Sequence, residues 1–306
     1  MDKTTSGNHQ GITPARDRYT TGSVTSTDGT SIGYRQYGSG PGLVLVQGAM
    51  GSAHNFSQLA EALSDTFTVY VPDRRGRGLS PLPYCKDHTI QRDVEDLEAL
   101  LTKTGTHHVF GLSSGALIVL QAALTLPPLQ KATIYEPPLF IKGMPTALLA
   151  RYEREITQNK LAAALITGMK AAQMGPPMFQ AMPHWLLSSL LSRIMTSEDK
   201  HGSGEYLSMR TLAPTLRYDF QVVAEMNGTI ESFRAIPCEV LLLGGSKSPA
   251  YLKADLDALE KMLPQVKRVE FPGLDHGSSW NYDKQRNPGG KPEVVAQELR
   301  RFFAEP

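Results

Sequence analysis

The hydrophobic positions of this sequence form two kinds of pattern, which alternate along the chain. Some short runs are almost entirely apolar, such as Leu43-Val44-Leu45-Val46, and such runs are typical of strands buried on both faces of a parallel sheet. Other segments carry apolar residues at helical spacing, such as Val94, Leu97 and Leu101. Strands and helices in alternation predict an α/β fold, with a mostly parallel central sheet and helices on both faces. The expected strands are 42–46, 67–71, 108–110, 132–135, 239–243 and 267–271, and the expected helices are 55–63, 87–101, 116–126 and 292–303.

The segments outside this alternation suggest the domain organisation. Residues 1–22 are polar and are interpreted as a flexible leader. Short strands at 23–24 and 31–36 flank Asp28-Gly29, a two-residue hairpin signal, so an antiparallel edge is expected.

The longest departure from the alternation is 140–236, where the pattern is helical only. We expect it to form a cap over the carboxyl edge of the sheet, where open α/β folds bind ligands. The core would then consist of 23–139 and 237–306. Most of the 11 methionines lie in the expected cap, where they either line an adaptable apolar pocket or fill its core.

Charge and composition limit the possible partners. The chain has 31 basic and 30 acidic residues, a formal net charge of +1, so no nucleic-acid partner is expected. Arg74, Arg75 and Arg77 share one loop without interleaved aromatic residues, and we interpret that loop as a turn. The uncharged segment 104–130 is interrupted by glycines and a proline, so it is interpreted as a strand, a turn and a buried helix and no membrane span is expected.

The two cysteines, Cys85 and Cys238, have no metal-binding spacing and are too few for a disulfide framework. We therefore expect neither a disulfide framework nor a zinc site, and the serine mechanism inferred below calls for no metal and no cofactor. The first residues lack the apolar core and cleavage site of a signal peptide, so a cytoplasmic protein is expected. A homodimer remains open.

The strongest chemical signal is Gly111-Leu112-Ser113-Ser114-Gly115. It follows an apolar strand and precedes a helical pattern, which is the context of a nucleophile elbow. In such a turn the serine is held in a strained conformation with its hydroxyl exposed, and the glycines avoid collisions with the neighbouring strand and helix. Ser113 is the expected nucleophile.

From about residue 23 to its end, the chain resembles the α/β-hydrolase fold family. Three further motifs support the resemblance: 44–49, where Gln47 replaces the family's usual histidine; 73–80, which matches D-x-x-G-x-G-x-S; and 272–277, which matches the exit of the last strand into the catalytic histidine. The resemblance implies that His276 is the general base for Ser113.

The resemblance also implies an oxyanion hole formed by the backbone N–H groups of Ala49 and Ser114. Gly48 would allow the loop to approach closely, and Met50 would border the acyl pocket. His54 follows this loop and is either a substrate contact or a polar residue at the start of a helix.

The triad acid departs from the family's commonest pattern. After strand 240–243 the chain reads Gly-Gly-Ser-Lys-Ser-Pro, without the usual carboxylate. Asp255 and Asp257 lie too far along the next helix. Glu136 instead ends the strand after the nucleophile helix, a position where some family members carry their acid, and we choose it. Asp219 and Asp275 are the next candidates.

These residues predict a serine hydrolase that cleaves an ester, lactone, thioester or related carbonyl compound through an acyl-enzyme on Ser113. Hydrolysis of a carbon–carbon bond is also compatible with them. The expected partner is a small, apolar substrate. The alternatives are a small-molecule receptor on the same fold and a non-hydrolytic relative, either a lyase or a cofactor-free dioxygenase.

Overall fold

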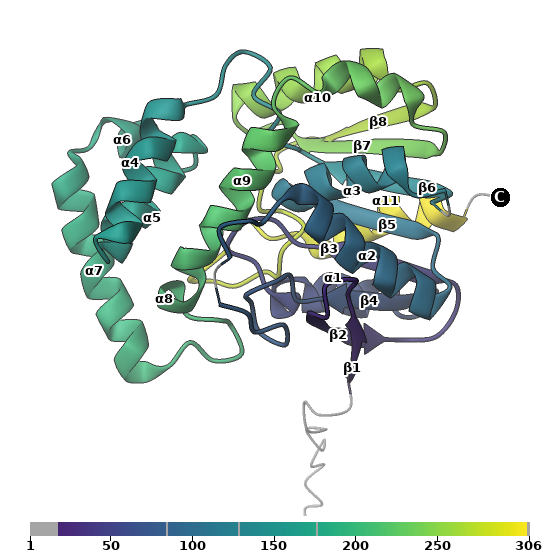
Figure 1. Cartoon of the computed structure of the whole chain (residues 1–306), viewed down its shortest axis with the longest axis horizontal. Helices are drawn as coiled ribbons and strands as arrows, with labels where there is room; N and C mark the ends of the chain where they lie inside the picture. The colour runs from purple at the N-terminus through teal and green to yellow at the C-terminus, as the bar shows by residue number, and fades with distance from the viewer. Residues whose placement is uncertain (1–17, 84, 128, 176, 305–306) are drawn as a thin grey trace, which may run out of the picture.

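The computed structural model describes residues 18–304 except 84, 128 and 176. Its centre is an eight-stranded sheet in the order β1-β2-β4-β3-β5-β6-β7-β8 (Figure 1). β2 pairs antiparallel with both β1 and β4, and all other neighbours are parallel. The strands are β1 (Thr20–Thr25), β2 (Ser31–Tyr37), β3 (Gly42–Val46), β4 (Thr68–Pro72), β5 (His108–Leu112), β6 (Lys131–Tyr135), β7 (Glu239–Gly245) and β8 (Val266–Phe271).

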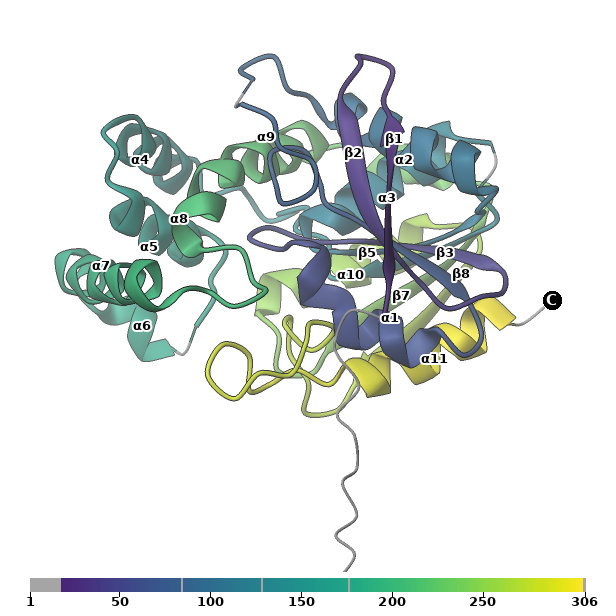
Figure 2. The same ribbon diagram turned by 90° about the horizontal axis from the view of Figure 1, so that it is seen from below.

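Helices cover both faces of this sheet, which confirms the predicted fold class. Figure 2 shows α1 and α11 on one face and α2 and α3 on the other. The helices that cover the sheet are α1 (Ser57–Leu63), α2 (Ile90–Thr104), α3 (Ser114–Thr125), α10 (Ala250–Met262) and α11 (Pro292–Ala304).

The apolar strands divide their side chains between the two faces. Leu43 and Leu45 of β3 belong to the core beneath α1 and α11, whereas Val44 and Val46 belong to the core beneath α2 and α3. All four are at most 3% exposed. This double burial explains why the strand is apolar at successive positions.

Between β6 and β7 the described chain contains helical elements only, and we call residues 140–236 the helical insert. Figure 1 shows α4 to α8 standing at one end of the sheet, with α9 between them and the strands. The helical elements of the insert are α4 (Thr146–Thr157), α5 (Leu161–Ala171), α6 (Pro177–Ala181), α7 (His184–His201), α8 (Met209–Leu212) and α9 (Leu216–Met226), with 3-10 turns η3 (Ala213–Thr215) and η4 (Ile230–Ala235).

Some element boundaries differ from the sequence expectation. Residues 20–22 were assigned to the leader but pair with β2, from Thr20 opposite Gln36, because the exposed hairpin arm continues its ladder beyond the apolar positions. Residues 1–17 of the leader lie outside the described part of the chain. The helix expected from residue 55 begins instead with a 3-10 turn, η2 (Ala53–Phe56). The one expected from residue 87 begins at Ile90, because Thr89 is extended.

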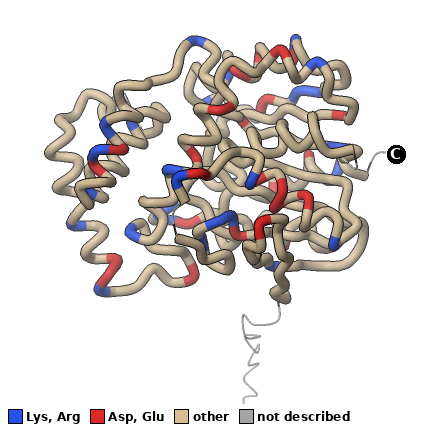
Figure 3. Tube along the Cα trace, viewed as in Figure 1, with Lys and Arg blue, Asp and Glu red and all other residues tan. Residues whose placement is uncertain are grey.

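Charged residues of both signs are interspersed along the trace in Figure 3, consistent with the near-zero net charge. None of the helices in the described ranges combines the length and apolar character that crossing a membrane requires.

Candidate active site

Ser113 occupies the sharp turn between β5 and α3. Its backbone has φ 56° and ψ −124°, a strained conformation for a residue with a side chain. A Cβ added to Gly111 would lie 2.6 Å from the carbonyl oxygen of Gly115, and one added to Gly115 would lie 2.5 Å from that of Gln47. Both glycines are therefore needed where strand, turn and helix meet.

His276 and Glu136 are brought together from segments far apart in the sequence. The Nδ1 atom of His276 lies 2.7 Å from Oε2 of Glu136, whose side chain is fully buried. Glu136 directly follows β6, the neighbour of β5, and the amide of Ser113 donates to the carbonyl of Tyr135 over 2.9 Å. Within the described residues the Ser113 hydroxyl donates no hydrogen bond.

The end of β7 is shaped to receive this glutamate. The amide of Gly245 donates to Oε1 of Glu136 over 2.6 Å. A Cβ added to Gly244 would lie 3.0 Å from the same oxygen. Gly244 and Gly245 thus end the strand after which the family's usual acid is missing. Because they have no side chains, they leave room for a carboxylate from the neighbouring strand.

The other acid candidates have different partners. Both carboxylate oxygens of Asp219 accept from arginines, at 2.6 Å each. Oδ1 of Asp275 accepts from the amide of Gly277 over 3.0 Å. Asp255 accepts from the amides of residues 140 and 141 and so binds the start of the helical insert. Among these carboxylates, only Glu136 contacts His276.

The loop after β3 turns sharply beside Ser113. A Cβ on Gly48 would lie 2.8 Å from Cβ of Ser113, so glycine permits the close approach. The amide of Gly51 donates to the carbonyl of Gly48 over 3.3 Å, and Met50 between them has φ 59°. Ala49 and Met50 pack against a buried apolar cluster of the helical insert, formed by Tyr152, Ile156, Ala164, Leu165, Met195, Ala213 and Leu216. We call residues 48–51 the β3 loop.

His54 follows the β3 loop and contacts the helical insert. Its Nδ1 atom lies 3.0 Å from a carboxylate oxygen of Glu205, and its ring meets that of Tyr206 edge-on at 4.4 Å. Burial, and then the nearby Arg35, lower the pKa of His54 below its ordinary value. It is therefore a polar contact between core and insert, and a role in substrate contact stays a prediction.

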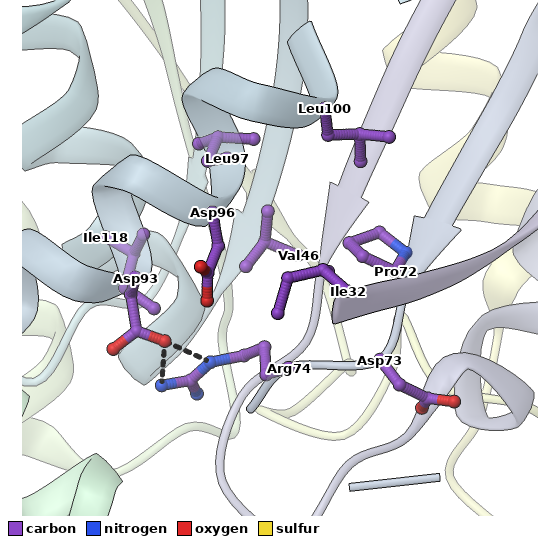
Figure 4. A pocket seen from close by; sticks show the side chains of 10 residues that line it. All are labelled: Ile32, Val46, Pro72, Asp73, Arg74, Asp93, Asp96, Leu97, Leu100 and Ile118. Atoms are coloured by element: carbon purple, nitrogen blue, oxygen red, sulfur yellow. Dashed lines mark hydrogen bonds and ion pairs between the residues drawn. The ribbon is translucent and has the colours of Figure 1, made fainter. Parts of the chain in front are cut away.

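Sequence reasoning missed a buried charge network beneath the β3 loop. Arg74 and Arg77 were interpreted as parts of a plain turn, yet both side chains are at most 5% exposed and paired with Asp219 of α9. Arg74 also pairs with Asp93, as Figure 4 shows, and His88 lies 2.9 Å from Asp93. Burial raises the pKa of Asp93, but Arg74 and then His88 outweigh that effect and lower the pKa to about 2. The only sequence signal was a run of arginines in a loop.

A small cavity lies beside this network, between α2, α3 and the sheet (Figure 4). Its volume is about 20 Å³, and Arg74, Asp93 and Asp96 line it together with apolar side chains. A cavity of this size accommodates a single water molecule. It lies within the core and is not a substrate pocket.

No cluster of three or more potential metal ligands (His, Cys, Asp or Glu) occurs in the described portion of the chain. The arrangement that remains is a strained serine, a histidine held by a buried carboxylate, and a glycine-rich loop beside the serine. Such a constellation can carry out acyl transfer without a metal.

Comparison with known proteins identifies the family of the chain. Residues 43–297 match the model of the alpha/beta hydrolase family, so the chain belongs to that family. A Bacillus subtilis protein described as uncharacterized hydrolase YraK is 26% identical over 271 residues, covering 84% of this chain and 90% of the relative. The N-formylmaleamate deformylase of Pseudomonas putida is 33% identical over 125 residues, or 40% of this chain and 47% of that protein.

Solved structures agree on the fold. An alpha/beta hydrolase from Sphaerobacter thermophilus superimposes with a TM-score of 0.72 and 28% identity, covering 92% of this chain and all of the other. The enol-lactonase of Burkholderia xenovorans does so with a TM-score of 0.66 and 17% identity over 93% of this chain and all of that protein. The protein is thus an enzyme of the alpha/beta hydrolase family.

Proposed function

We propose that this enzyme is a serine hydrolase that cleaves a carboxylic ester, lactone or related carbonyl substrate through an acyl-enzyme on Ser113. The observation that carries the proposal is the 2.7 Å contact between Nδ1 of His276 and the buried carboxylate of Glu136. This contact fixes the proton of the ring on Nδ1, so Nε2 is left free to accept a proton.

The reaction then follows from these groups. Nε2 of His276 takes the hydroxyl proton of Ser113 as Oγ attacks the carbonyl carbon. The resulting oxyanion is stabilised by the backbone N–H groups of Ala49 and Ser114. His276 then gives the proton to the departing alkoxide, which leaves as an alcohol. Water, activated by the same ring, releases the carboxylic acid and restores Ser113.

The helical insert serves in this proposal as a cap over the site. Ala49 and Met50 of the β3 loop pack against its apolar cluster, so the insert lies directly against the loop that would border the acyl group. An apolar substrate is favoured there, because burial of its surface contributes to binding.

The test is labelling of the purified protein with a fluorophosphonate probe, followed by mass spectrometry of the adduct. The wild type should be labelled on Ser113, and the Ser113→Ala variant should be unlabelled while it keeps its circular dichroism spectrum. A panel of p-nitrophenyl esters, a lactone and an N-formyl amide, run in parallel, identifies the bond that is cleaved. A folded wild type with neither adduct nor turnover would refute the proposal and favour the receptor, the lyase or the dioxygenase.

A further inference from the structure

Asp219 lies on α9 of the helical insert, and both of its carboxylate oxygens accept hydrogen bonds. Its Oδ1 accepts from Arg74 over 2.6 Å and from the hydroxyl of Ser114 over 2.7 Å. Its Oδ2 accepts from Arg77 over 2.6 Å. The side chains of Asp219 and of both arginines are at most 5% exposed, so these charge-assisted bonds form away from water. The proposed mechanism does not use Asp219.

Arg77 carries this network to the β3 loop. Its Nη1 donates to the carbonyl oxygen of Gly48 over 2.9 Å and to that of Gly51 over 3.1 Å. The carbonyl of Gly48 and the N–H of Ala49 belong to one peptide unit. Because a trans peptide is planar, its C=O and N–H point in opposite directions. Arg77, by holding the Gly48 carbonyl on one side, directs the Ala49 N–H to the other.

Ser114 connects the same carboxylate to the second proposed donor. Its hydroxyl binds Asp219 and also accepts from Arg74 over 3.1 Å. Its backbone N–H lies in the first turn of α3, where helical N–H groups have no partner within the helix. A single carboxylate from the insert therefore binds the side chain of one donor residue directly and, through Arg77, the peptide that contains the other donor.

We propose that Asp219 and Arg77 are positioning residues. They hold the two oxyanion donors, Ala49 N–H and Ser114 N–H, in the orientation required beside Ser113. The inference rests on the proposed hydrolase function. Arg77 adds a further effect, because a cation bound to the Gly48 carbonyl polarises that peptide and makes the Ala49 N–H a stronger donor. Through Asp219, α9 of the insert thus contributes to the placement of both donors.

The test compares Arg77→Gln with Arg75→Gln in the full-length enzyme. Arg75 is a matched control: it lies in the same loop, is also buried, and pairs with Asp28 and Asp96 without touching the β3 loop. The assays are kcat and KM for p-nitrophenyl butyrate, the inhibition constant of an alkyl trifluoromethyl ketone, and the melting temperature. The ketone forms a hemiketal oxyanion on serine, so its affinity reports the oxyanion hole specifically.

We expect Arg77→Gln to lower kcat about 100-fold with KM within about threefold, as loss of an oxyanion donor does. The ketone should lose affinity by a similar factor. Arg77→Lys should recover only part of the rate, since an ammonium cannot bind a carboxylate and two carbonyls as a guanidinium fork does. Arg75→Gln should lower the melting temperature but leave kcat and ketone affinity within about threefold.

Equal kcat for the Arg77→Gln and Arg75→Gln variants, or a fall in kcat without weaker ketone binding, would overturn the inference while the proposed function stood. If Arg77→Gln does not fold, Ser114→Ala tests the other arm of the proposal, the bond between Asp219 and Ser114, because it removes that bond and keeps the backbone N–H. It should lower kcat and ketone affinity together, and unchanged values would overturn the inference. A wild type without turnover or adduct would instead refute the function, and the inference with it.

Discussion

Replacement of Glu136 by glutamine changes the proposed acid without changing its size. The amide oxygen can still accept from Gly245, but the amide nitrogen would face His276 and donate to Nδ1. The ring proton would then sit on Nε2, the atom that must accept the proton of Ser113. The substitution also removes the negative charge that stabilises the imidazolium during the reaction.

The magnitude follows from the geometry. The 2.7 Å contact between Nδ1 and Oε2 places the centres of the two charges about 4 Å apart, and such a pair interacts by about 4 kcal/mol at an effective dielectric constant near 20. Loss of that stabilisation in the transition state corresponds to about a 1,000-fold lower kcat. KM should change little, because the substrate does not contact Glu136 in the proposed mechanism.

The assay is steady-state hydrolysis of p-nitrophenyl butyrate by the wild type, Glu136→Gln and the control Asp275→Asn. Asp275 precedes His276 directly but binds the amide of Gly277 instead of the ring. It should retain at least about a tenth of the wild-type kcat, since backbone hydrogen bonds of this kind contribute only about 1 kcal/mol. A Glu136→Gln variant within threefold of the wild type would refute the assignment, and a larger loss in Asp275→Asn would move the acid there.

Three further changes test packing and ionisation. Gly244→Ala should lower the free energy of unfolding by about 1–3 kcal/mol and lower kcat, because its Cβ would lie 2.7 Å from Cδ1 of Leu256 and 3.0 Å from Oε1 of Glu136; urea unfolding and kcat measure the two effects, and an unchanged variant would contradict the close fit. Gly168→Ala, within α5, should raise the free energy of unfolding by about 0.5–1 kcal/mol in the same assay, since the nearest atoms to its Cβ are 3.4 Å away. A lower free energy of unfolding would show that the added methyl group collides with its neighbours. Burial lowers the pKa of His54 and of His108, so the unfolded chain binds these protons at higher pH than the folded protein, and the free energy of unfolding should rise as the pH increases toward about 6.5, the ordinary pKa of histidine. Calorimetry below about pH 6.5 should show a flatter rise of the free energy of unfolding with pH in the His54→Gln and His108→Gln variants. A slope equal to that of the wild type in both variants would show that neither histidine causes the pH dependence.

The fold could be predicted because its signals are local. The apolar run of β3 indicates burial on both faces without knowledge of its neighbours, and the glycines around Ser113 report the crowding of one turn. The choice of Glu136 as the acid stays a prediction, and it rested on the missing carboxylate after β7 together with the resemblance to family members whose acid follows β6. The hydrogen bond between Glu136 and the amide of Gly245 depends on the pairing of β6 with β7. The local sequence pattern does not reveal that pairing.

The charge network was beyond sequence reasoning for a physical reason. Arg77 and Asp219 are separated by 142 positions, and nothing in the composition of either segment indicates that the two side chains meet. A loop of arginines with a near-neutral chain is ordinarily a solvated turn. In this protein α9 of the insert covers the arginine loop and buries its charges, and buried charges are stable only when they are paired.

The position of Glu136 also determines how this enzyme can be recombined with its relatives. The carboxylate lies only a few residues before the helical insert, whereas Ser113 and His276 belong to segments outside it. An exchange of residues 136–236 for the equivalent part of a relative whose acid follows β7 would supply no carboxylate from either strand, because this chain ends β7 in Gly244 and Gly245. In the proposed mechanism, libraries that graft new inserts onto this core must therefore keep Glu136 in the recipient, or restore an acid after β7 at the same time.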